Sequence, residues 1–407
     1  MNNTPELLSP AGDLDKMRFG IAYGADAVYM AGTRFGMRAA ATNFDDNALR
    51  EGIAYAHAHG VKCYITVNIM PSNRDLPALP AYLELLQDAG ADALIIADVG
   101  VLRMARRYAP RVPVHISTQT SILNHEAANY WADEGAERIV LARELSLEEI
   151  AEIRAKTPKE LEIEAFVHGA MCISYSGRCL ISQYMTGRDA NHGACAQPCR
   201  WNYSLMEEKR PGQFFPDGRG TYLYNSKDMC MIEHVPELIE AGITSFKIEG
   251  RNKTAYYAAC VTGAYRAAID AYRKDPNGFV LPQFCRDEVN KVSHREYYTG
   301  FYFGNQENGQ HYGASQYIRE YEVVGMPVEC DDSGKAVFAL KNRFFDGDEL
   351  ELIQPGQVPY VFRAENVTDD EGTKRELFNV PQMRVHFAFP FKVSEWAILR
   401  KVKERPE

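Results

Sequence analysis

Four cysteines gather in one short stretch of the chain, and thiols at this density indicate metal chemistry. Successive members are separated by six, fifteen and three residues: Cys172, Cys179, Cys195 and Cys199. Several glycines in and beside the stretch let the backbone turn tightly enough to bring four sulfurs onto one centre. The chain has nine cysteines in all, and an odd number argues against a full disulfide framework. The stretch therefore predicts a metal site held by thiolates.

The spacing of the four cysteines bears on which metal they would hold. Zinc usually takes two CxxC-like pairs, whereas a [4Fe–4S] cluster accepts looser spacing. Only Cys195 and Cys199 lie close together, and they do not form a CxxC pair. The spacing thus favours an iron–sulfur cluster, with zinc as the alternative metal and buried, unligated cysteines as a third interpretation. Cys230 is a fifth nearby thiol and an alternative to one of the four ligands.

Composition narrows the class of protein. The 407 residues are enough for two domains, and 46% hydrophobic with 25% charged residues is typical of a globular protein. No stretch reaches the ~18 apolar residues of a membrane helix, and the N-terminus lacks a secretory signal pattern. These features predict a cytoplasmic protein with reduced thiols and no membrane partner. They give no indication of oligomeric state.

The net charge bears on nucleic-acid binding. A charge of −10 gives no overall attraction to RNA, so an RNA partner requires a local basic patch. The C-terminal tail is one candidate, and a solvated chain end is the alternative interpretation. Its basic residues are Arg400, Lys401, Lys403 and Arg405.

Short apolar runs alternate with longer amphipathic ones up to about residue 250. The predicted strands are Glu6–Ser9, Ala27–Ala31, Cys63–Asn68, Ala93–Ala97, Val114–Thr118, Arg138–Ala142, Ile163–Val167, Thr221–Tyr224 and Thr244–Ile248. Alternation with helices such as Asp45–His59 implies right-handed βαβ units and a parallel sheet. Eight or so units predict an α/β fold with a TIM-like (β/α)₈ barrel, and an open sheet is the alternative.

A barrel of this type carries its chemistry at the carboxyl ends of its strands. Many polar side chains are predicted there, some of them only as turn formers or helix caps. They are Ser9, Asn68, Asp98, Gln119, Arg143, His168, Asn225, Lys227, Glu249 and Arg251. No GxGxxG follows the first strand and no P-loop is present, so a nucleotide site of the usual kind is not expected.

The chain divides into three predicted parts. Residues 1–280 form the TIM-like barrel with the cysteine site, and residues 281–316 form a linker. From residue 317 to 407 short alternating strands separated by turns predict a small antiparallel β-barrel domain. Peptidase motifs are absent, since neither HExxH nor GxSxG occurs. A Cys–His pair using His168 conflicts with metal binding, because a metal-bound thiolate cannot also attack a peptide.

Five segments resemble the collagenase-like peptidase U-thirty-two family. The longest is EAFVHGAMCISYSGRCLIS, from Glu164 to Ser182. The others are Glu6–Gly12, Tyr23–Tyr29, Asn225–Asp228 and Lys247–Arg251. The resemblance spans the whole chain, including the C-terminal domain. Better understood members of the family resemble oxygen-independent, prephenate-linked hydroxylases with an iron–sulfur cluster.

The resemblance implies a particular branch of that family. One branch hydroxylates the wobble uridine of tRNA at carbon 5. A second branch acts on a cytidine of 23S ribosomal RNA and is longer, and a third pair acts in ubiquinone synthesis and lacks the C-terminal domain. The length of this chain and its single β domain look most like the tRNA branch. The alternatives are a true peptidase, as the family name states, and a non-catalytic metal-containing RNA-binding protein.

Roles for individual residues follow from this resemblance. Cys172, Cys179, Cys195 and Cys199 are then the cluster ligands. Prephenate carries two carboxylates, which suit the cations Arg143, Lys227 and Arg251. His168 is predicted to transfer protons or order the site, and Glu164 to orient the backbone or Arg178. The implied partner is the tRNA anticodon loop, whose bases are single-stranded, with the β domain and basic tail holding the RNA backbone.

Overall fold

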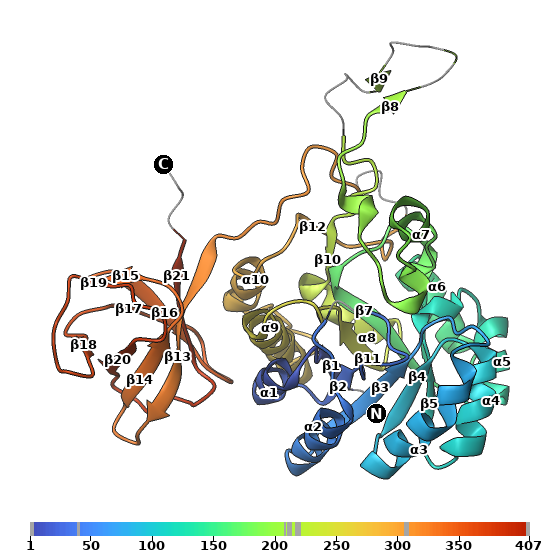
Figure 1. Ribbon diagram of the computed structural model, residues 1–407, viewed down its shortest axis with the longest axis horizontal. Helices are drawn as coiled ribbons and strands as arrows, with labels where there is room; N and C mark the ends of the chain where they lie inside the picture. The colour runs from blue at the N-terminus through green and yellow to red at the C-terminus, as the bar shows by residue number, and fades with distance from the viewer. Residues whose placement is uncertain are drawn as a thin grey trace.

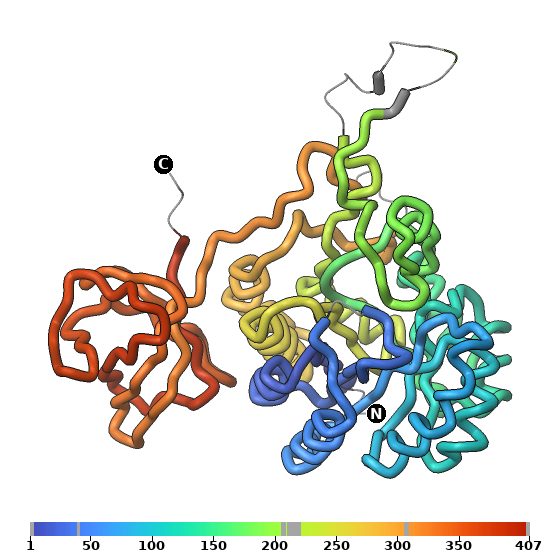
Figure 2. The backbone as a smooth tube through the Cα atoms, viewed as in Figure 1, coloured from blue at the N-terminus to red at the C-terminus, as the bar shows by residue number. Residues whose placement is uncertain are grey.

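The computed structural model describes residues 4–38, 41–206, 209, 214–215, 221–304 and 309–403. It consists of a barrel domain and a smaller β domain beside it, joined by an extended segment (Figures 1 and 2). No helix in the described ranges is long and apolar enough to cross a membrane.

Eight parallel strands form the barrel, in the order β11-β1-β2-β3-β4-β5-β6-β7, and β11 pairs with β7 to close the sheet. They are β1 (Glu6–Pro10), β2 (Ala27–Met30), β3 (Lys62–Val67), β4 (Ala93–Ile96), β5 (Val114–Ile116), β6 (Arg138–Val140), β7 (Glu162–Ala170) and β11 (Ser245–Ile248). Strands such as β2 and β4 are buried along their whole length, because helices cover the outer face. The closed pairing confirms the TIM-like barrel and overturns the open-sheet alternative.

Helices surround this barrel (Figure 1). They are α1 (Leu14–Ala22), α2 (Asp46–Ala58), α3 (Leu79–Ala89), α4 (Val99–Tyr108), α5 (His125–Asp133), α6 (Leu147–Ala155), α8 (Val235–Glu240) and α9 (Ala255–Lys274). Most begin at a side chain that accepts a backbone N–H of the first turn, as Asp45, Asp98 and Ser146 do. The cap at Asp45 explains why the helix expected at Asp45–His59 agrees closely with α2.

The prediction of a strand at Thr221–Tyr224 is wrong. Thr221 makes only an isolated bridge to Tyr203, and a turn follows it. The alternating pattern there serves local pairing in a long excursion between β7 and α8, which contains α7 (Ile181–Thr186) and a small hairpin of β8 (Leu205–Met206) and β9 (Phe214–Phe215). The extra strands on the barrel sheet are instead β10 (Asp228–Cys230), antiparallel to the end of β7, and β12 (Tyr297–Tyr298).

The second domain is built on a seven-stranded antiparallel sheet in the order β17-β16-β21-β13-β14-β20-β18. Its strands are β13 (Tyr321–Cys330), β14 (Lys335–Leu340), β16 (Glu349–Ile353), β17 (Tyr360–Arg363), β18 (Thr368–Asp369), β20 (Arg384–Ala388) and β21 (Ile398–Val402), and β15 (Phe344–Phe345) pairs with β19 (Leu377–Phe378). Among the described residues β17 and β18 do not pair with each other, so the curled sheet is a half-barrel. The prediction of a small antiparallel β domain is confirmed.

The segment expected as a linker carries structure of its own. It contains α10 (Gln283–Asn290), which packs against α9, and β12. The second domain meets α9 and α10 through Arg400, which is fully buried. Its guanidinium binds Glu288 of α10 and Glu351 of β16, and Nη1 donates to Tyr256 of α9 at 3.1 Å.

Two residues of the expected basic tail, Arg400 and Lys401, therefore do not lie free for RNA, whereas Lys403 is exposed. Arg400 and Lys401 belong to β21, where Lys401 is buried and its Nζ lies 3.2 Å from Asp348. Their charges are neutralised inside the protein because the strand continues through them. Arg405 lies outside the described residues. The RNA-binding role assigned to Arg400 and Lys401 is thus wrong.

Candidate active site

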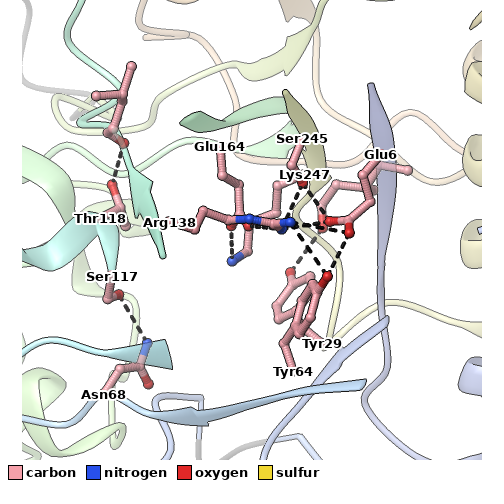
Figure 3. A network of polar contacts seen from close by, with 12 residues as sticks. Glu6, Tyr29, Tyr64, Asn68, Ser117, Thr118, Arg138, Glu164, Ser245 and Lys247 are labelled. Atoms are coloured by element: carbon pink, nitrogen blue, oxygen red, sulfur yellow. Dashed lines mark hydrogen bonds and ion pairs between the residues drawn. The ribbon is translucent and has the colours of Figure 1, made fainter. Parts of the chain in front are cut away.

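The lower interior of the barrel holds a network of matched charges, which we call the floor network: Glu6, Arg138, Glu164 and Lys247. Arg138 Nη1 lies 2.6 Å from Glu6 and 3.0 Å from Glu164. Lys247 Nζ lies 2.6 Å from the other carboxylate oxygen of Glu164. Figure 3 shows these side chains converging between the strands, with Tyr64 and Ser245 joining through hydrogen bonds. Each buried charge in the network meets an opposite one.

Glu164 is consequently a structural ion-pair partner in this conformation. Its side chain is 0% exposed and is bound by Arg138 and Lys247, not by Arg178. It does not line the cavity above the network. Its predicted catalytic role stays a prediction, whereas Lys247 connects the floor network to that cavity.

A cavity of about 100 Å³ opens above the floor network, at the carboxyl ends of the strands. We call it the mouth cavity. Side chains from several strand ends line it: Tyr29, Arg38, Asn68, Gln119, Arg143, Phe166, Lys247, Glu249 and Arg251. The position agrees with the expected location of barrel chemistry. Asn68, Gln119, Arg143, Glu249 and Arg251 from the sequence-based set meet here, although they are far apart in the chain.

All four clustered cysteines line the mouth cavity. Turns bring them there: Gly177 and Gly193 have φ values of 84° each, and Gln197 is left-handed at 57° before the turn that carries Cys199. All four are free thiols. Backbone N–H groups of Ile181 and Gln197 donate to the sulfurs of Cys179 and Cys195, each at 3.4 Å. Hydrogen bonds of this kind tune the thiolates of iron–sulfur sites.

The donor set fits a four-thiolate centre in residue type and in lining one cavity. No three His, Cys, Asp or Glu residues in the described ranges stand at metal-binding geometry, so the thiols would have to close onto a cluster. Burial, together with the other three thiols, raises the pKa of Cys199 to about 11. Cys230 does not line this cavity, and burial raises its pKa to about 12.

Arg251 is the most exceptional cation of the mouth cavity. It is 3% exposed, and its Nη2 donates to the carbonyl of Met37. Its Nε and Nη1 are buried and have no hydrogen-bond partner. Arg143 donates to the carbonyl of Ala170 at 3.1 Å and covers the ring of Phe166. Both guanidiniums thus bring charge to the cavity with few internal acceptors.

Arg38 and Glu249 complete the charge pattern of the mouth cavity. Arg38 Nε lies 3.6 Å from Glu249 Oε1. Burial by itself raises the pKa of Glu249, but Arg38, Arg251 and Arg143 outweigh it and hold that pKa below its usual value. Arg38 was not identified from the sequence. The available signal was a basic residue in the glycine-containing loop after β2.

Lys227 lies away from the other two predicted carboxylate-binding residues. It does not line the mouth cavity, and its Nζ lies 3.1 Å from Glu296. Its backbone N–H donates to the carbonyl of Gly309 at 3.0 Å. The structure thus brings Arg143 and Arg251 together and leaves Lys227 in a partly exposed ion pair.

His168 also lies outside the mouth cavity. The register between β7 and β11 shifts after Phe166, so His168 and Phe166 contact different parts of the molecule. The imidazole packs against Tyr257 and Tyr265 of α9, and its Nε2 lies 3.3 Å from the Tyr297 hydroxyl. Burial lowers its pKa to about 3, so the ring is neutral near pH 7. Its proton-transfer role stays a prediction.

Comparison with known proteins adds the family. The profile of Peptidase family U32 matches residues 12–312, and that of the Peptidase family U32 C-terminal domain matches residues 319–400. The chain belongs to peptidase family U32. The family predicted from the sequence motifs is confirmed, and two of the motifs, at Glu164–Ser182 and Lys247–Arg251, supply cysteines and cations of the mouth cavity.

Three relatives within family U32 are informative. The chain is 38% identical over 403 residues to "tRNA hydroxylation protein P1" of Bacillus subtilis (strain 168), covering 98% of this chain and 95% of that protein. It is 38% identical over 396 residues to "tRNA hydroxylation protein P" of Escherichia coli (strain K12), covering 86% of each. A further relative is the "23S rRNA 5-hydroxycytidine C2501 synthase" of the same strain, 36% identical over 329 residues, 79% of this chain and 48% of that protein.

Proposed function

We propose that this protein is an RNA-modifying enzyme that hydroxylates the wobble uridine of tRNA at carbon 5. One structural observation carries the proposal: four free thiols and two cations with few acceptors, Arg143 and Arg251, line a single cavity at the carboxyl end of a barrel. Support for RNA as the substrate comes from the names of relatives that match almost the whole chain. The net reaction breaks the carbon 5–hydrogen bond, forms a carbon 5–oxygen bond and removes two electrons, so an oxygen donor and an electron acceptor must enter the site with the RNA.

Cys172, Cys179, Cys195 and Cys199 would hold a [4Fe–4S] cluster at the cavity wall. When bound, such a cluster supplies one-electron redox chemistry that protein side chains lack. The chain's own contribution is to fix the sulfurs by turns and by N–H donors from Ile181 and Gln197.

Prephenate as co-substrate would place its carboxylates on Arg251 and Arg143. Arg251 offers two buried N–H donors that no group of the protein uses, and a buried unpaired donor costs free energy. The two donors point to different sides of the guanidinium, because Nη1 lies on the Cδ side and Nε–H points away from it, so they suit two separate acceptor oxygens. Glu249 limits the positive charge and holds Arg38 toward the cavity. The site therefore favours a dianion over a neutral ligand.

A peptidase mechanism finds little support in the mouth cavity. A cysteine nucleophile needs a base within hydrogen-bond reach, and His168 faces the tyrosines of α9 instead. The described lining of the cavity contains no histidine. Hydroxylation is thus better supported than proteolysis despite the family name.

The test compares Cys172→Ala with Cys230→Ala, because Cys230 is a half-buried free cysteine that does not line the cavity. Each variant is purified without oxygen and analysed for iron and sulfide. Each is also expressed in cells whose own copy of the protein has been deleted, and the tRNA nucleosides of those cells are measured by mass spectrometry. We expect about four iron atoms per chain, and loss of both iron and 5-hydroxyuridine in Cys172→Ala only. Zinc in place of iron, or full hydroxylation by Cys172→Ala, overturns the redox proposal. Hydrolysis of gelatin by metal-free protein favours the peptidase.

A further inference from the structure

A second cavity of about 120 Å³ shares part of its lining with the mouth cavity, including three of the cysteines. We call it the outer cavity. The shared residues are Arg38, Cys172, Cys195, Cys199 and Glu249. The rest of the lining includes Gln197, Arg200, Lys253, Arg295 and Tyr317. The cysteines therefore form a wall with one cavity toward the barrel interior and another toward the segment that leads to the second domain.

Arg200 brings a positive charge to the outer cavity that the described protein does not neutralise. Its nitrogens donate to three neutral oxygens, those of the Asn225 side chain and of the Ser226 and Met171 carbonyls, at 2.6–2.7 Å. No ion pair joins it to a carboxylate within the described ranges. The charge is held in place by neutral acceptors and is left for an external anion.

Lys253 is a second cation of this kind. Its Nζ donates to the carbonyl of Ser293 at 2.8 Å and lies over the ring of Tyr317 at 4.2 Å. No carboxylate in the described part of the chain pairs with it. Burial lowers its pKa to about 8, with Arg295 and Arg319 adding to the effect and the carboxylates of Asp228 and Glu249 opposing it. A bound anion would restore the full charge of this ammonium group.

Arg295 completes the set. It is 5% exposed and binds Asp228 through Nη1 at 3.2 Å, but its Nε is buried without a partner. Its guanidinium lies over the ring of Tyr317, 4.3 Å from the ring centroid. Arg295 and Lys253 thus both stack on Tyr317, which holds them beside the cavity.

We propose that the outer cavity binds a phosphate of the RNA backbone next to the nucleotide being modified. The inference rests on the proposed function and adds a binding site to it. Arg200, Lys253 and Arg295 bring three cations to the lining of one cavity, which suits the charge and several oxygens of a phosphate group. Glu249, the acid in the lining, is engaged with Arg38. A phosphate held here places the attached nucleotide against the cysteine wall, while the mouth cavity keeps its separate cations for the carboxylates.

The proposal predicts how salt affects RNA binding. An anticodon stem-loop RNA is titrated by fluorescence anisotropy against the full-length protein at a series of potassium chloride concentrations. Lys253→Gln should weaken binding about tenfold and lower the slope of log affinity against log salt by about one. Lys253→Arg should keep the slope. Lys62→Gln is the matched control, since Lys62 is exposed at the start of β3, at the opposite end of the barrel.

A second variant guards against misfolding of the first. Gln197 is exposed and lines the outer cavity, so Gln197→Glu adds a negative charge without emptying a buried position. It should weaken stem-loop binding by a similar factor. An unchanged salt slope in Lys253→Gln, or normal affinity in Gln197→Glu, overturns the phosphate site.

Further arms separate this proposal from the proposed function. If Lys253→Gln loses affinity for inorganic phosphate but binds the stem-loop normally, the cavity takes free phosphate and the RNA site is overturned. If the wild-type protein shows the expected slopes but forms no 5-hydroxyuridine, the phosphate site stands and the hydroxylase proposal fails. If the wild-type protein forms 5-hydroxyuridine but Lys253→Gln leaves the salt slope unchanged, the hydroxylase proposal stands and the phosphate site fails.

Discussion

The two ends of the barrel interior bury cations in opposite ways. In the floor network Arg138 is 2% exposed and reaches Glu6 and Glu164 at ion-pair distance. At the mouth, Arg251 is equally buried but keeps two nitrogens without a partner. Unpaired buried donors are costly, and Arg251 has two of them on one guanidinium that lines a cavity, which suits a cation that binds a ligand.

The difference suggests that the charged residues at one end of the barrel serve stability and those at the other end serve ligand binding. The N-terminal ends of the strands are closed by charges that satisfy each other, and the carboxyl ends keep charges that await a ligand. Lys247 marks the border, since it binds Glu164 below and lines the mouth cavity above. Substitutions at the two ends should therefore have different consequences, and the following four tests are ordered by the size of the expected effect.

The largest effect is expected from Arg138→Met. Removing this guanidinium leaves Glu6 and Glu164 buried with fewer partners, and breaking such a pair costs about 3–5 kcal/mol of unfolding free energy. Arg251→Met is the matched control at the mouth and should cost at most about 1 kcal/mol, because it removes two unpaired donors. Urea unfolding followed by circular dichroism measures both. Equal losses in the two variants would break the comparison.

The next effect concerns pH and His168, which lies in β7 and is buried against α9, outside the mouth cavity. Its pKa of about 3 in the folded protein lies below the usual value near 6.5, so the unfolded chain takes up the proton first as pH falls. Above pH 6.5 the imidazole is neutral in both the folded and the unfolded chain, so it does not make the unfolding free energy depend on pH. Below pH 6.5 the unfolding free energy falls by up to about 1.4 kcal/mol per pH unit.

His168→Gln should flatten this acid loss between pH 6.5 and about pH 4. His115 remains as a second buried histidine with a lowered pKa, caused first by burial and then by Arg138 and Lys247, so the variant keeps part of the slope. The measurement is urea unfolding at several pH values. Parallel curves for the variant and the wild type would mean that His168 is protonated in the folded protein.

A smaller free-energy change but a clear loss of activity is expected for Arg251→Met. The lost charged hydrogen bonds to a carboxylate correspond to about 1.5–3 kcal/mol of binding. The concentration of prephenate needed for half-maximal hydroxylation should rise accordingly, with stem-loop affinity unchanged. Arg251→Lys should recover only part, because a single ammonium group does not reproduce the separately directed donors of the guanidinium. A change in RNA affinity without a change in prephenate dependence would reassign Arg251 to the RNA.

Much of the fold could be predicted because it rests on local patterns. Apolar runs mark the barrel strands, and capping residues such as Asp45 and Ser146 mark helix starts. The approach of the four cysteines could likewise be expected from their density. Thr221 failed as a strand because its pattern serves pairing with Tyr203 in a loop, which no local signal distinguishes from a barrel strand.

What could not be predicted depends on contacts between distant segments. Arg38 joins the site only because its loop crosses the mouth to Glu249. Arg400 looked like part of a solvated tail, yet it is buried by Glu288 and Glu351, which come from a different domain and a different strand. His168 shares a strand with Phe166 but is turned away by a register shift that involves β11. Each case needs a partner that sequence spacing does not reveal.

The smallest effect is expected at Lys227. It forms a partly exposed ion pair with Glu296, with side chains 19% and 45% exposed. Such a pair contributes about 0–1 kcal/mol. Lys227→Gln should therefore leave unfolding free energy and prephenate dependence close to those of the wild type, in contrast to Arg251→Met. A rise in the half-maximal prephenate concentration equal to that of Arg251→Met would instead show that Lys227 moves to the mouth cavity when the ligand binds. Carboxylate binding would then extend beyond the cations that now line this cavity.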